Sequence, residues 1–425
     1  MNNVVQLNDQ CSSHEVIKTA EESLYKEDIH VARQPIFDRH SNVYAYELLF
    51  RSGSENSANI TDGNSASSQV IINAFINVGF QTITSGKPAF LNLTEDFVLG
   101  KIPLPLPQEF LVIEVLEDIE ASDKVLAALR EFSEQGYTIA LDDYLLEEDK
   151  LPFFDVVDIV KVDVMECDKE QLESRVKEMK GRGLKLLAEK VETYEEYELY
   201  RDMGFDFFQG YYFSKPMVFK EQSIKPNRLA VLRLLSMIQD KDCKFAELEQ
   251  IICQDVSMSY KVLRIVNSAL YSIQREITSI RQAIVALGLN TIKEWLLIIV
   301  FTDIKDKPQE LLKLSLQRAR MMHSLAEIAN LDVDACFTAG LFSSIDALMD
   351  APMDEIVKQL PLSNEIISAL LARDGKIGKL LQVVIDFEQG EFARSTPERL
   401  SSKDFQHCYL ESIAWSNELI SNISD

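Results

Sequence analysis

The sequence predicts an α/β plus all-α protein, in which a (β/α)8-type barrel is followed by an all-helical domain. Between His30 and Pro216, short apolar runs alternate with amphipathic helical patterns, which is typical of a parallel α/β fold. From Leu229 to Phe387 the apolar residues recur at helical spacing, with few strand signals and short connections. The predicted divisions are a leader (1–28), a barrel domain (29–216), a linker (217–228), a helical domain (229–390) and a C-terminal extension with one amphipathic helix (391–425).

Composition restricts the classes of function. The chain has 425 residues, of which 46% are apolar and 26% charged, as in an ordinary globular protein of two or three domains. A formal net charge of -25 disfavours DNA or RNA as partners, because phosphate contacts need clustered Lys and Arg. The six cysteines include no CxxC pair and indicate a reducing compartment. The most apolar run, Trp295–Phe301, is too short to span a bilayer, so we expect a cytoplasmic protein without a membrane partner.

The barrel is predicted to begin with a β-hairpin. Val31–Phe37 and Val43–Leu49 have strand character, and the polar stretch Asp38–Asn42 between them is the predicted turn. Residues 52–66 are rich in Ser, Asn and Gly and are predicted to form a loop. Residues 67–80 have apolar residues at helical spacing.

Six further strands are predicted at regular intervals, and most carry a polar residue near the carboxyl end. Their bounds are Ala89–Leu93, Phe110–Leu116, Thr138–Tyr144, Ile159–Val164, Leu184–Val191 and Phe205–Phe213. Helices are predicted between them at 118–135, 168–181 and 193–203. Because a helix C-terminus favours a residue that tolerates positive φ, we expect these helices to end at Gly136, Gly181 and Gly204. No GxGxxG or GxxxxGK[ST] loop is present, which disfavours the nucleotide-binding folds built on them.

Polar residues at the carboxyl ends of parallel barrel strands meet at one rim, where barrels build their active sites. Five of these residues have side-chain oxygens that can bind a metal ion: Glu47, Asn92, Glu114, Asp142 and Asp143. Such a set suits Mg²⁺ or Mn²⁺, and an adjacent aspartate pair can serve two metals about 3.5–4 Å apart, an arrangement that splits phosphodiesters.

Three further residues have suitable chemistry for that reaction. Lys161 is suited to orient or activate a water, Glu189 to take its proton, and Arg51 to hold a phosphate. Taken singly, each of the eight residues is more simply explained as a salt bridge, a cap or a solvated group. Only their convergence favours a site.

Seven motifs, in this order, resemble an EAL domain: YELLFR, FLNL, IEVLE, LDDY, VKVD, AEKVE and QGYYFSKP, within residues 30–216. EAL domains are barrels that hydrolyse cyclic di-GMP to the linear dinucleotide, so the resemblance implies a phosphodiesterase with two Mg²⁺ or Mn²⁺ ions. By position, it implies metal ligands at Glu47, Asn92, Glu114, Asp142 and Asp143. It also implies a catalytic lysine at Lys161, a general base at Glu189, and substrate-binding residues at Arg51, Gln209 and Glu192.

Two positions depart from the EAL pattern. Leu48 replaces the signature alanine, which is a small apolar change. The segment Tyr144–Asp149 lacks the glycines of the DDFGTGYSSL-like loop of active members, and a loop that needs positive φ is not simply copied with Leu and Glu. A poorly held metal site turns over slowly. The sequence therefore leaves a second hypothesis open, a cyclic di-GMP receptor or protein scaffold that binds without cutting. A third, two purely structural adaptors, accounts poorly for the retained site residues.

The helical half resembles an HDOD domain, the non-catalytic relative of HD-type metal phosphohydrolases. The resemblance rests on residues 248–269, on IRQAIVAL (280–287) and on AGLFSSID (339–346). Ser343 and Ser344 take the place of the catalytic His-Asp pair, and two hydroxyls cannot replace those metal ligands. The domain is expected to be regulatory and to bind a protein partner that the sequence does not identify.

Two other residues in this half have simpler explanations than metal binding. His323 is expected to be a core or capping histidine, and Asp346 a helix cap. The order EAL then HDOD resembles the bacterial family named after YuxH, in which the loop after the two aspartates is commonly altered too. That family suggests control of motility and biofilm formation, and the resemblance allows a homodimer.

Overall fold

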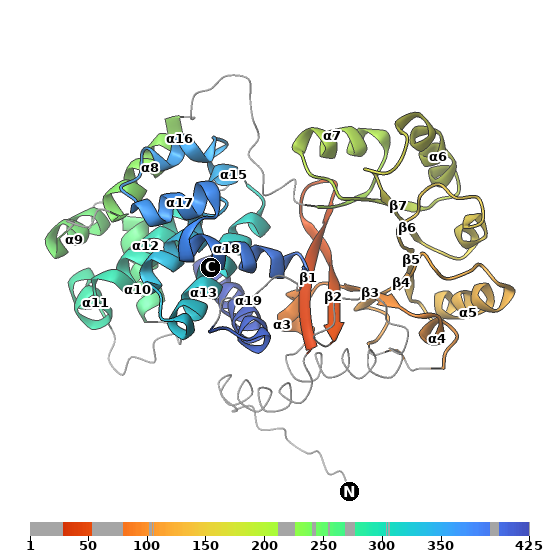
Figure 1. Cartoon of the computed structure of the whole chain (residues 1–425), viewed down its shortest axis with the longest axis horizontal. Coiled ribbons are helices and arrows are strands. Elements are labelled where there is room, and N and C mark those ends of the chain that lie inside the picture. Colours follow the sequence, from red (N-terminus) through yellow and green to blue (C-terminus); the bar gives the residue numbers. More distant parts are fainter. Residues whose placement is uncertain are drawn as a thin grey trace, which may run out of the picture.

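A computed structural model describes residues 29–52, 80–101, 104, 106–210, 226–239, 244–253, 256–267, 277–302, 304, 307–391 and 399–424. Within them, eight strands close into a barrel and a body of helices lies beside it, which confirms the predicted fold class (Figure 1). The predicted leader, the loop and helix expected between Ser52 and Phe80, and the linker before Pro226 lie outside the described residues. The domain boundaries stay a prediction.

The barrel combines one hairpin with a parallel sheet. Its strands are β1 Ile29–Asp38, β2 Val43–Ser52, β3 Ala89–Leu93, β4 Leu111–Val115, β5 Thr138–Leu141, β6 Ile159–Asp163, β7 Lys185–Glu189 and β8 Phe207–Gln209. Strands β2 to β8 pair in parallel, whereas β1 is antiparallel to both β2 and β8. The predicted hairpin and its turn, closed by Asp38 N–H donating to Asn42 O at 2.8 Å, are confirmed. β5 is shorter than predicted, because the backbone leaves the sheet near Asp143 (φ 42).

The interior of the barrel has an apolar layer below a polar one. The apolar layer contains Ala45, Phe90, Val112, Ala140, Ile159, Leu187 and Phe207, one from each strand of the parallel set. Two residues further along the chain from each of these lie Glu47, Asn92, Glu114, Asp142, Lys161, Glu189 and Gln209. Because strand side chains alternate between faces, the register that buries the apolar layer also brings all seven polar residues to one rim.

Short helices flank the barrel strands: α3 Phe80–Thr84, α4 Glu95–Val98, α5 Asp123–Glu134, α6 Lys169–Gly181 and α7 Tyr194–Met203. Gly136 (φ 92) and Gly204 (φ 122) take the left-handed conformation, as predicted. Helix α6 ends at Gly181, as predicted, but Gly181 does not take the left-handed conformation. Gly183 (φ 85) takes it instead, because Leu184 N–H closes the helix end on Met179 O at 3.2 Å.

The helical body contains α8 Pro226–Gln239, α9 Phe245–Cys253, α10 Val256–Val266, α11 Ile280–Leu287, α12 Leu289–Thr302, α13 Gln309–Ala329, α14 Val333–Phe342, α15 Ile345–Met349, α16 Met353–Val357, α17 Asn364–Ala372, α18 Gly375–Glu388 and α19 Ser402–Ser424. Helix α8 begins at Pro226, inside the predicted linker, because proline suits the first position of a helix. Among the described helices, no single one has the length and hydropathy of a membrane span, and only the pair α11–α12, bent by 119°, passes that test together.

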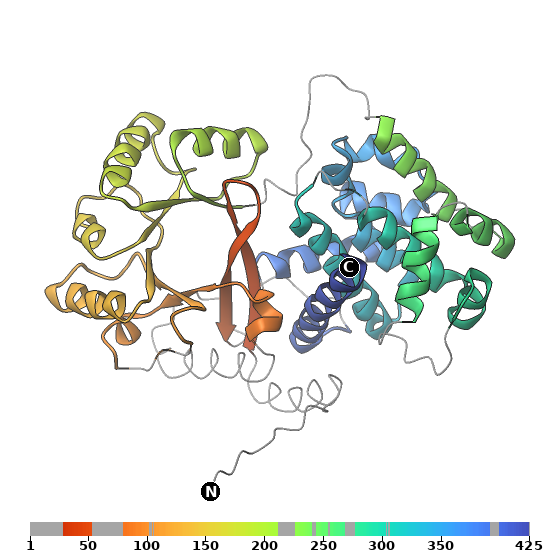
Figure 2. The ribbon, with the colours of Figure 1, turned by 180° about the vertical axis from the view of Figure 1, so that it is seen from behind.

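The C-terminal helix joins the two halves of the molecule. Helix α19 packs along α13 and reaches α3 and β1 of the barrel (Figures 1 and 2). Among the described residues, β8 pairs with β1 at Ile36–Asp38, and no strand pairs with that edge of β1 before Ile36. Gln406 Oε1 accepts from Val31 N–H at 2.8 Å, and Tyr409 Oη accepts from Arg33 N–H at 3.3 Å. The predicted extension therefore caps an edge of the barrel sheet.

Glu294 of α12 makes the stability of the helical body depend on pH. Burial and the charge of Asp334 raise the pKa of Glu294 to about 7, and Arg320 opposes them. Between about pH 4.5 and pH 7 the folded state then binds more protons than the unfolded state, so stability falls as pH rises. Replacing Glu294 with Gln is expected to flatten this slope and to raise the Tm near pH 8. Thermal unfolding of both proteins across this range checks it, and parallel curves would contradict it.

Candidate functional site

The rim of the barrel gathers four carboxylates around one buried lysine. Lys161 Nζ lies 2.7 Å from Asp142 Oδ1, 3.0 Å from Glu189 Oε1 and 3.4 Å from Glu47 Oε2, and it also contacts Glu114 Oε1. These five side chains come from five different strands or strand ends and are 14% exposed or less. The five residues form what we call the rim cluster.

Side-chain amides hold Glu47 in the rim cluster. Gln209 Nε2 donates to Glu47 Oε2 at 2.6 Å and to Gln34 Oε1 at 3.0 Å. Asn92 Nδ2 donates to Glu47 Oε1 at 3.3 Å. The structure thus brings both predicted amides to the site. It also adds Gln34, which sequence reasoning missed. Gln34 could have been found from its position opposite Glu47 in the β1–β2 hairpin, but only if the register of that hairpin had been known.

The rim cluster contains four acidic groups and only one basic group. Burial, followed by Glu47, raises the pKa of Glu114 well above its usual range, although Lys161 opposes this. Burial also raises the pKa of Glu189 to about 8, with Lys161 opposing and Asp142 adding to it. If all were ionised, four carboxylates and one ammonium would leave three uncompensated negative charges. A buried site of this kind takes up protons or further cations.

Three oxygens at the rim lack a hydrogen-bond donor or ion-pair partner among the described residues: Asn92 Oδ1, Gln209 Oε1 and Glu114 Oε2. Carboxylate and amide oxygens are ligands of Mg²⁺ and Mn²⁺, so the donor set fits these ions. In the described part of the chain, no three His, Cys, Asp or Glu residues have the geometry of a metal site. The four carboxylates of the rim cluster converge instead on the ammonium of Lys161.

Three predicted site residues are not members of the rim cluster. Burial raises the pKa of Asp143, with Lys190 opposing this rise and Asp163 and Glu117 adding to it. Glu192 is exposed, and its N–H donates to Glu196 Oε2 at 2.8 Å at the start of α7. The backbone of Arg51 pairs with His30 in the hairpin, while its side chain lies outside the described residues. The roles of Asp143, Glu192 and Arg51 stay predictions.

The loop after the two aspartates reaches the left-handed conformation without glycine. Leu146 has φ 67, which costs about 1–2 kcal/mol for a residue with a side chain. Tyr144 anchors the loop, because its N–H donates to Lys161 O at 3.0 Å and its buried ring packs edge-on against Phe154 at 5.3 Å. The loop is thus fastened to the strand that carries Lys161.

Gly210 sets the spacing between the ends of β7 and β8. A Cβ there would lie 2.1 Å from Val191 O, and Gly210 has φ 144. Replacing Gly210 with Ala is expected to cost about 1–3 kcal/mol of stability, as in overpacked cores. It should also displace the adjacent Gln209 from Glu47. Gly183→Ala is the control, since Gly183 also has a positive φ (85) but no neighbour within 4 Å of the place that a Cβ would take, so it isolates the backbone cost from the steric one. Equal losses of stability in urea unfolding would contradict the steric account.

Ser343 and Ser344 of the helical domain belong to a buried network of hydrogen bonds. Ser343 Oγ donates to Gly340 O at 2.7 Å and accepts from Arg318 Nη1 at 3.2 Å. Arg318 Nε donates to Glu388 Oε2 at 2.8 Å. Ser344 Oγ lies 2.7 Å from Ser315 Oγ. The Arg318 guanidinium thus lies next to one of the two serines that the sequence resemblance places at the position of the His-Asp pair.

His323 and Asp346 occupy ordinary structural positions. His323 is half-buried, packs edge-on against Phe337 at 6.2 Å, and has Glu327 Oε1 at 3.7 Å from Nε2. Asp346 Oδ1 accepts from Ala347 N–H at 2.9 Å in the first turn of α15, where Ser344 is the N-cap residue. Asp346 is predicted to be the helix cap, but it lies in the first turn of the helix, where its carboxylate accepts a backbone N–H.

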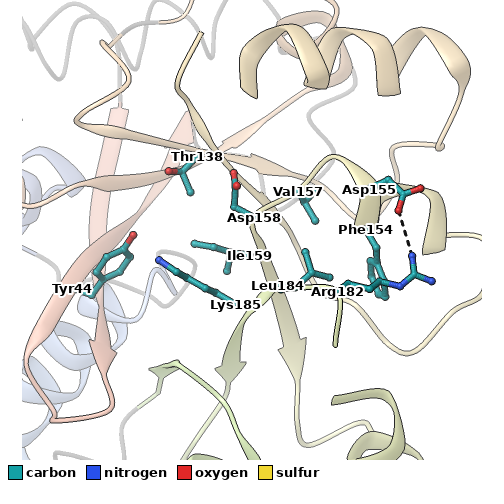
Figure 3. A pocket seen from close by; sticks show the side chains of 11 residues that line it. Tyr44, Thr138, Phe154, Asp155, Val157, Asp158, Ile159, Arg182, Leu184 and Lys185 are labelled. Atoms are coloured by element: carbon teal, nitrogen blue, oxygen red, sulfur yellow. Dashed lines mark hydrogen bonds and ion pairs between the residues drawn. The ribbon is translucent and has the colours of Figure 1, made fainter. Parts of the chain in front are cut away.

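A cavity of about 530 Å³ lies at the opposite, N-terminal end of the barrel strands (Figure 3). Its acidic and basic groups are largely paired, since Arg182 contacts Asp155 at 3.4 Å and Asp158 Oδ2 accepts from Ile139 N–H at 2.9 Å. Tyr44 stacks on Phe207 with 4.3 Å between ring centroids. None of the predicted site residues lines this cavity. Because this face of a barrel usually serves stability, the candidate site is the opposite rim.

Comparison with known proteins covers both halves of the chain. The EAL domain family matches residues 69–216 and the HDOD domain family matches residues 227–360. The uncharacterized protein YuxH of Bacillus subtilis is 34% identical over 404 residues, covering 92% of this chain and 99% of that protein. The cyclic di-GMP phosphodiesterase CdgJ of Vibrio cholerae is 33% identical over 400 residues, covering 92% and 93%. A solved EAL domain protein from Listeria monocytogenes EGD-e aligns at 22% identity with a TM-score of 0.35, covering 49% and 94%.

Proposed function

Because the chain belongs to the family that joins an EAL domain to an HDOD domain, we propose that its barrel is a phosphodiesterase that hydrolyses cyclic di-GMP to linear pGpG. The observation that carries the proposal is the rim cluster, with four carboxylates and unpaired amide and carboxylate oxygens at the rim. CdgJ, a relative over nearly the whole length, is a cyclic di-GMP phosphodiesterase.

Two divalent ions, Mg²⁺ or Mn²⁺, would be held by Glu47, Asn92, Glu114, Asp142 and Asp143. When bound, such ions supply charge neutralisation at the phosphate and a more acidic water. Gln209 and Asn92 keep the Glu47 carboxylate in place through their amide hydrogen bonds. Lys161 holds the carboxylates together and keeps a positive charge next to the bound phosphate.

Glu189 is the proposed general base. Its pKa is raised to about 8 by burial, which brings its proton affinity close to that needed near neutral pH. Glu189 is also held 3.0 Å from Lys161 Nζ, which fixes its carboxylate at the rim. Arg51, Gln209 and Glu192 are the proposed substrate contacts, with Arg51 pairing with a phosphate.

The helical domain is proposed to be regulatory. Ser343 and Ser344 cannot act as metal ligands, and both are occupied in hydrogen bonds inside the domain. An unidentified protein is its proposed partner. We also propose a homodimer, because the loop after the two aspartates is coupled to the dimer contact in the EAL domains that this chain resembles. A cytoplasmic location is proposed as well.

One experiment tests the enzyme. Purified full-length protein is incubated with cyclic di-GMP and Mn²⁺, and the nucleotides are separated by chromatography. Linear pGpG is expected, and chelation of the metal is expected to stop its formation. No product above the level of a Glu189→Gln variant would contradict the proposed activity.

A receptor that binds cyclic di-GMP without cutting it is the second candidate. It is favoured by two observations: Asp143 is not among the four carboxylates that pair with Lys161, and Leu146 is strained where active relatives carry glycines. Calorimetry with cyclic di-GMP and Ca²⁺ tests it. Binding without product in the Mn²⁺ assay would support the receptor, and no binding would exclude both nucleotide functions.

A further inference from the structure

The β1–β2 hairpin presents one face to the rim cluster and the other to the helical domain. Gln34 and Glu47 pair across the hairpin and point into the barrel, where Gln209 joins them. The preceding residue on each strand, Arg33 or Tyr46, is buried on the outer face. Figures 1 and 2 show the hairpin as the part of the barrel that faces the helices.

The outer face of the hairpin holds a buried polar cluster shared with α13. Tyr46 Oη lies 3.0 Å from each carboxylate oxygen of Glu310, and burial together with Glu310 raises the Tyr46 pKa, so the hydroxyl is the donor. The Arg33 guanidinium lies 4.3 Å from the centre of the Tyr46 ring, and its Nη1 donates to Ile83 O. Lys313 Nζ lies 3.8 Å from Glu310 Oε2.

Glu310 is fixed strongly by this arrangement. It is 7% exposed and Tyr46 is 1% exposed, so neither side chain can exchange its partner for bulk water. A buried carboxylate that loses its hydrogen-bond donor destabilises the folded state, because its desolvation is no longer compensated. Any movement of α13 relative to the hairpin therefore moves Tyr46 or breaks a buried contact.

We propose that Glu310 of the helical domain, acting through Tyr46, is a positioning residue for Glu47, so that the helical domain sets the geometry of the rim cluster. Tyr46 and Glu47 are neighbours on one strand with side chains on opposite faces. A twist of the strand that shifts the Tyr46 hydroxyl therefore swings the Glu47 carboxylate. Functional groups need to be held within about 0.5 Å and 10–20° of their working geometry. The inference rests on the proposed function, because it assigns a regulatory input to that same site.

The test measures Mn²⁺ affinity of the full-length protein by calorimetry, which does not depend on turnover. Tyr46→Phe and Glu310→Ala are expected to weaken the affinity by about 10–100-fold, as loss of a supporting contact does at metal sites. Glu310→Gln, which keeps an acceptor oxygen for Tyr46, is expected to recover most of it. Asp350→Asn is the matched control. It alters the buried Lys307–Asp350 pair within the helical domain and keeps a residue type that tolerates φ 51.

The outcomes separate this inference from the proposed function. Wild-type affinity in both Tyr46→Phe and Glu310→Ala would overturn the positioning role, as would an equal loss in Asp350→Asn. If Glu310→Ala does not fold, Tyr46→Phe decides, because it removes a single oxygen atom. If the wild-type protein binds no Mn²⁺, the proposed metal-dependent activity fails. Hydrogen exchange of residues 43–52 then decides the positioning role. Faster exchange in Tyr46→Phe than in Asp350→Asn supports it, and equal exchange overturns it.

Discussion

Replacing Glu189 with Gln is expected to lower kcat for cyclic di-GMP hydrolysis by about 10²–10⁴-fold, the usual contribution of a general base. The amide keeps the size of the side chain but cannot accept the proton of an attacking water. Affinity for cyclic di-GMP with Ca²⁺ in place of Mn²⁺ is expected to stay within a few-fold of wild type. The measurements are initial rates at saturating nucleotide and calorimetric binding.

Glu195→Gln is the matched control for this prediction. Glu195 is exposed in the first turn of α7, six residues further along the chain, and lies outside the rim cluster. Its substitution is expected to leave kcat unchanged. A Glu189→Gln protein with wild-type kcat would exclude Glu189 as the base. A variant that no longer binds nucleotide would instead indicate that Glu189 has a role in holding the site together with Lys161.

The barrel and the strand positions of its site could be predicted because side chains alternate between the two faces of a strand, which gives the sequence a period of two residues. In β4, for example, Val112 belongs to the apolar layer and Glu114 lies one interior position above it. Every strand that buries an apolar residue in the lower layer must present its next interior residue at the same rim. The strand bounds, and hence the set of rim residues, are local properties of the sequence.

The partners of these side chains could not be predicted in the same way. That Lys161 lies among four carboxylates depends on the order of strands around the closed barrel. The contact of Gln34 depends on the hairpin register, and the placement of Asp143 depends on a backbone turn at φ 42 just after β5. The docking of α19 on β1 joins segments at opposite ends of the chain, and its amphipathic pattern predicts a helix without saying which surface it covers.

The same limit applies to Ser343 and Ser344. Their chemistry disfavours a metal site from sequence alone, but the cation that contacts Ser343, Arg318, comes from another helix. The sequence shows only that the His-Asp pair is missing, whereas the structure shows that Arg318, Glu388 and Ser343 form a buried network at this place.

Replacing Arg318 with Ala is expected to lower the free energy of unfolding of the helical domain by about 3–5 kcal/mol. Arg318 and Glu388 are each 5% exposed, and burial raises the pKa of Glu388 while Arg318 opposes that rise. Removing the guanidinium leaves a buried carboxylate and the Ser343 hydroxyl without their donor. Urea unfolding of the full-length protein, followed by circular dichroism of the helices, measures the loss.

Two variants show whether the loss comes from the unpaired charge. Arg320→Ala, two residues along the same helix, breaks a pair with Glu411 in which both side chains are about one-third exposed, and it is expected to cost at most about 1 kcal/mol. The double variant Arg318→Met with Glu388→Met removes both buried charges at similar volume, and it is expected to recover most of the stability lost in Arg318→Ala. A double variant as unstable as Arg318→Ala would mean that Arg318 acts mainly through packing instead of through its charge.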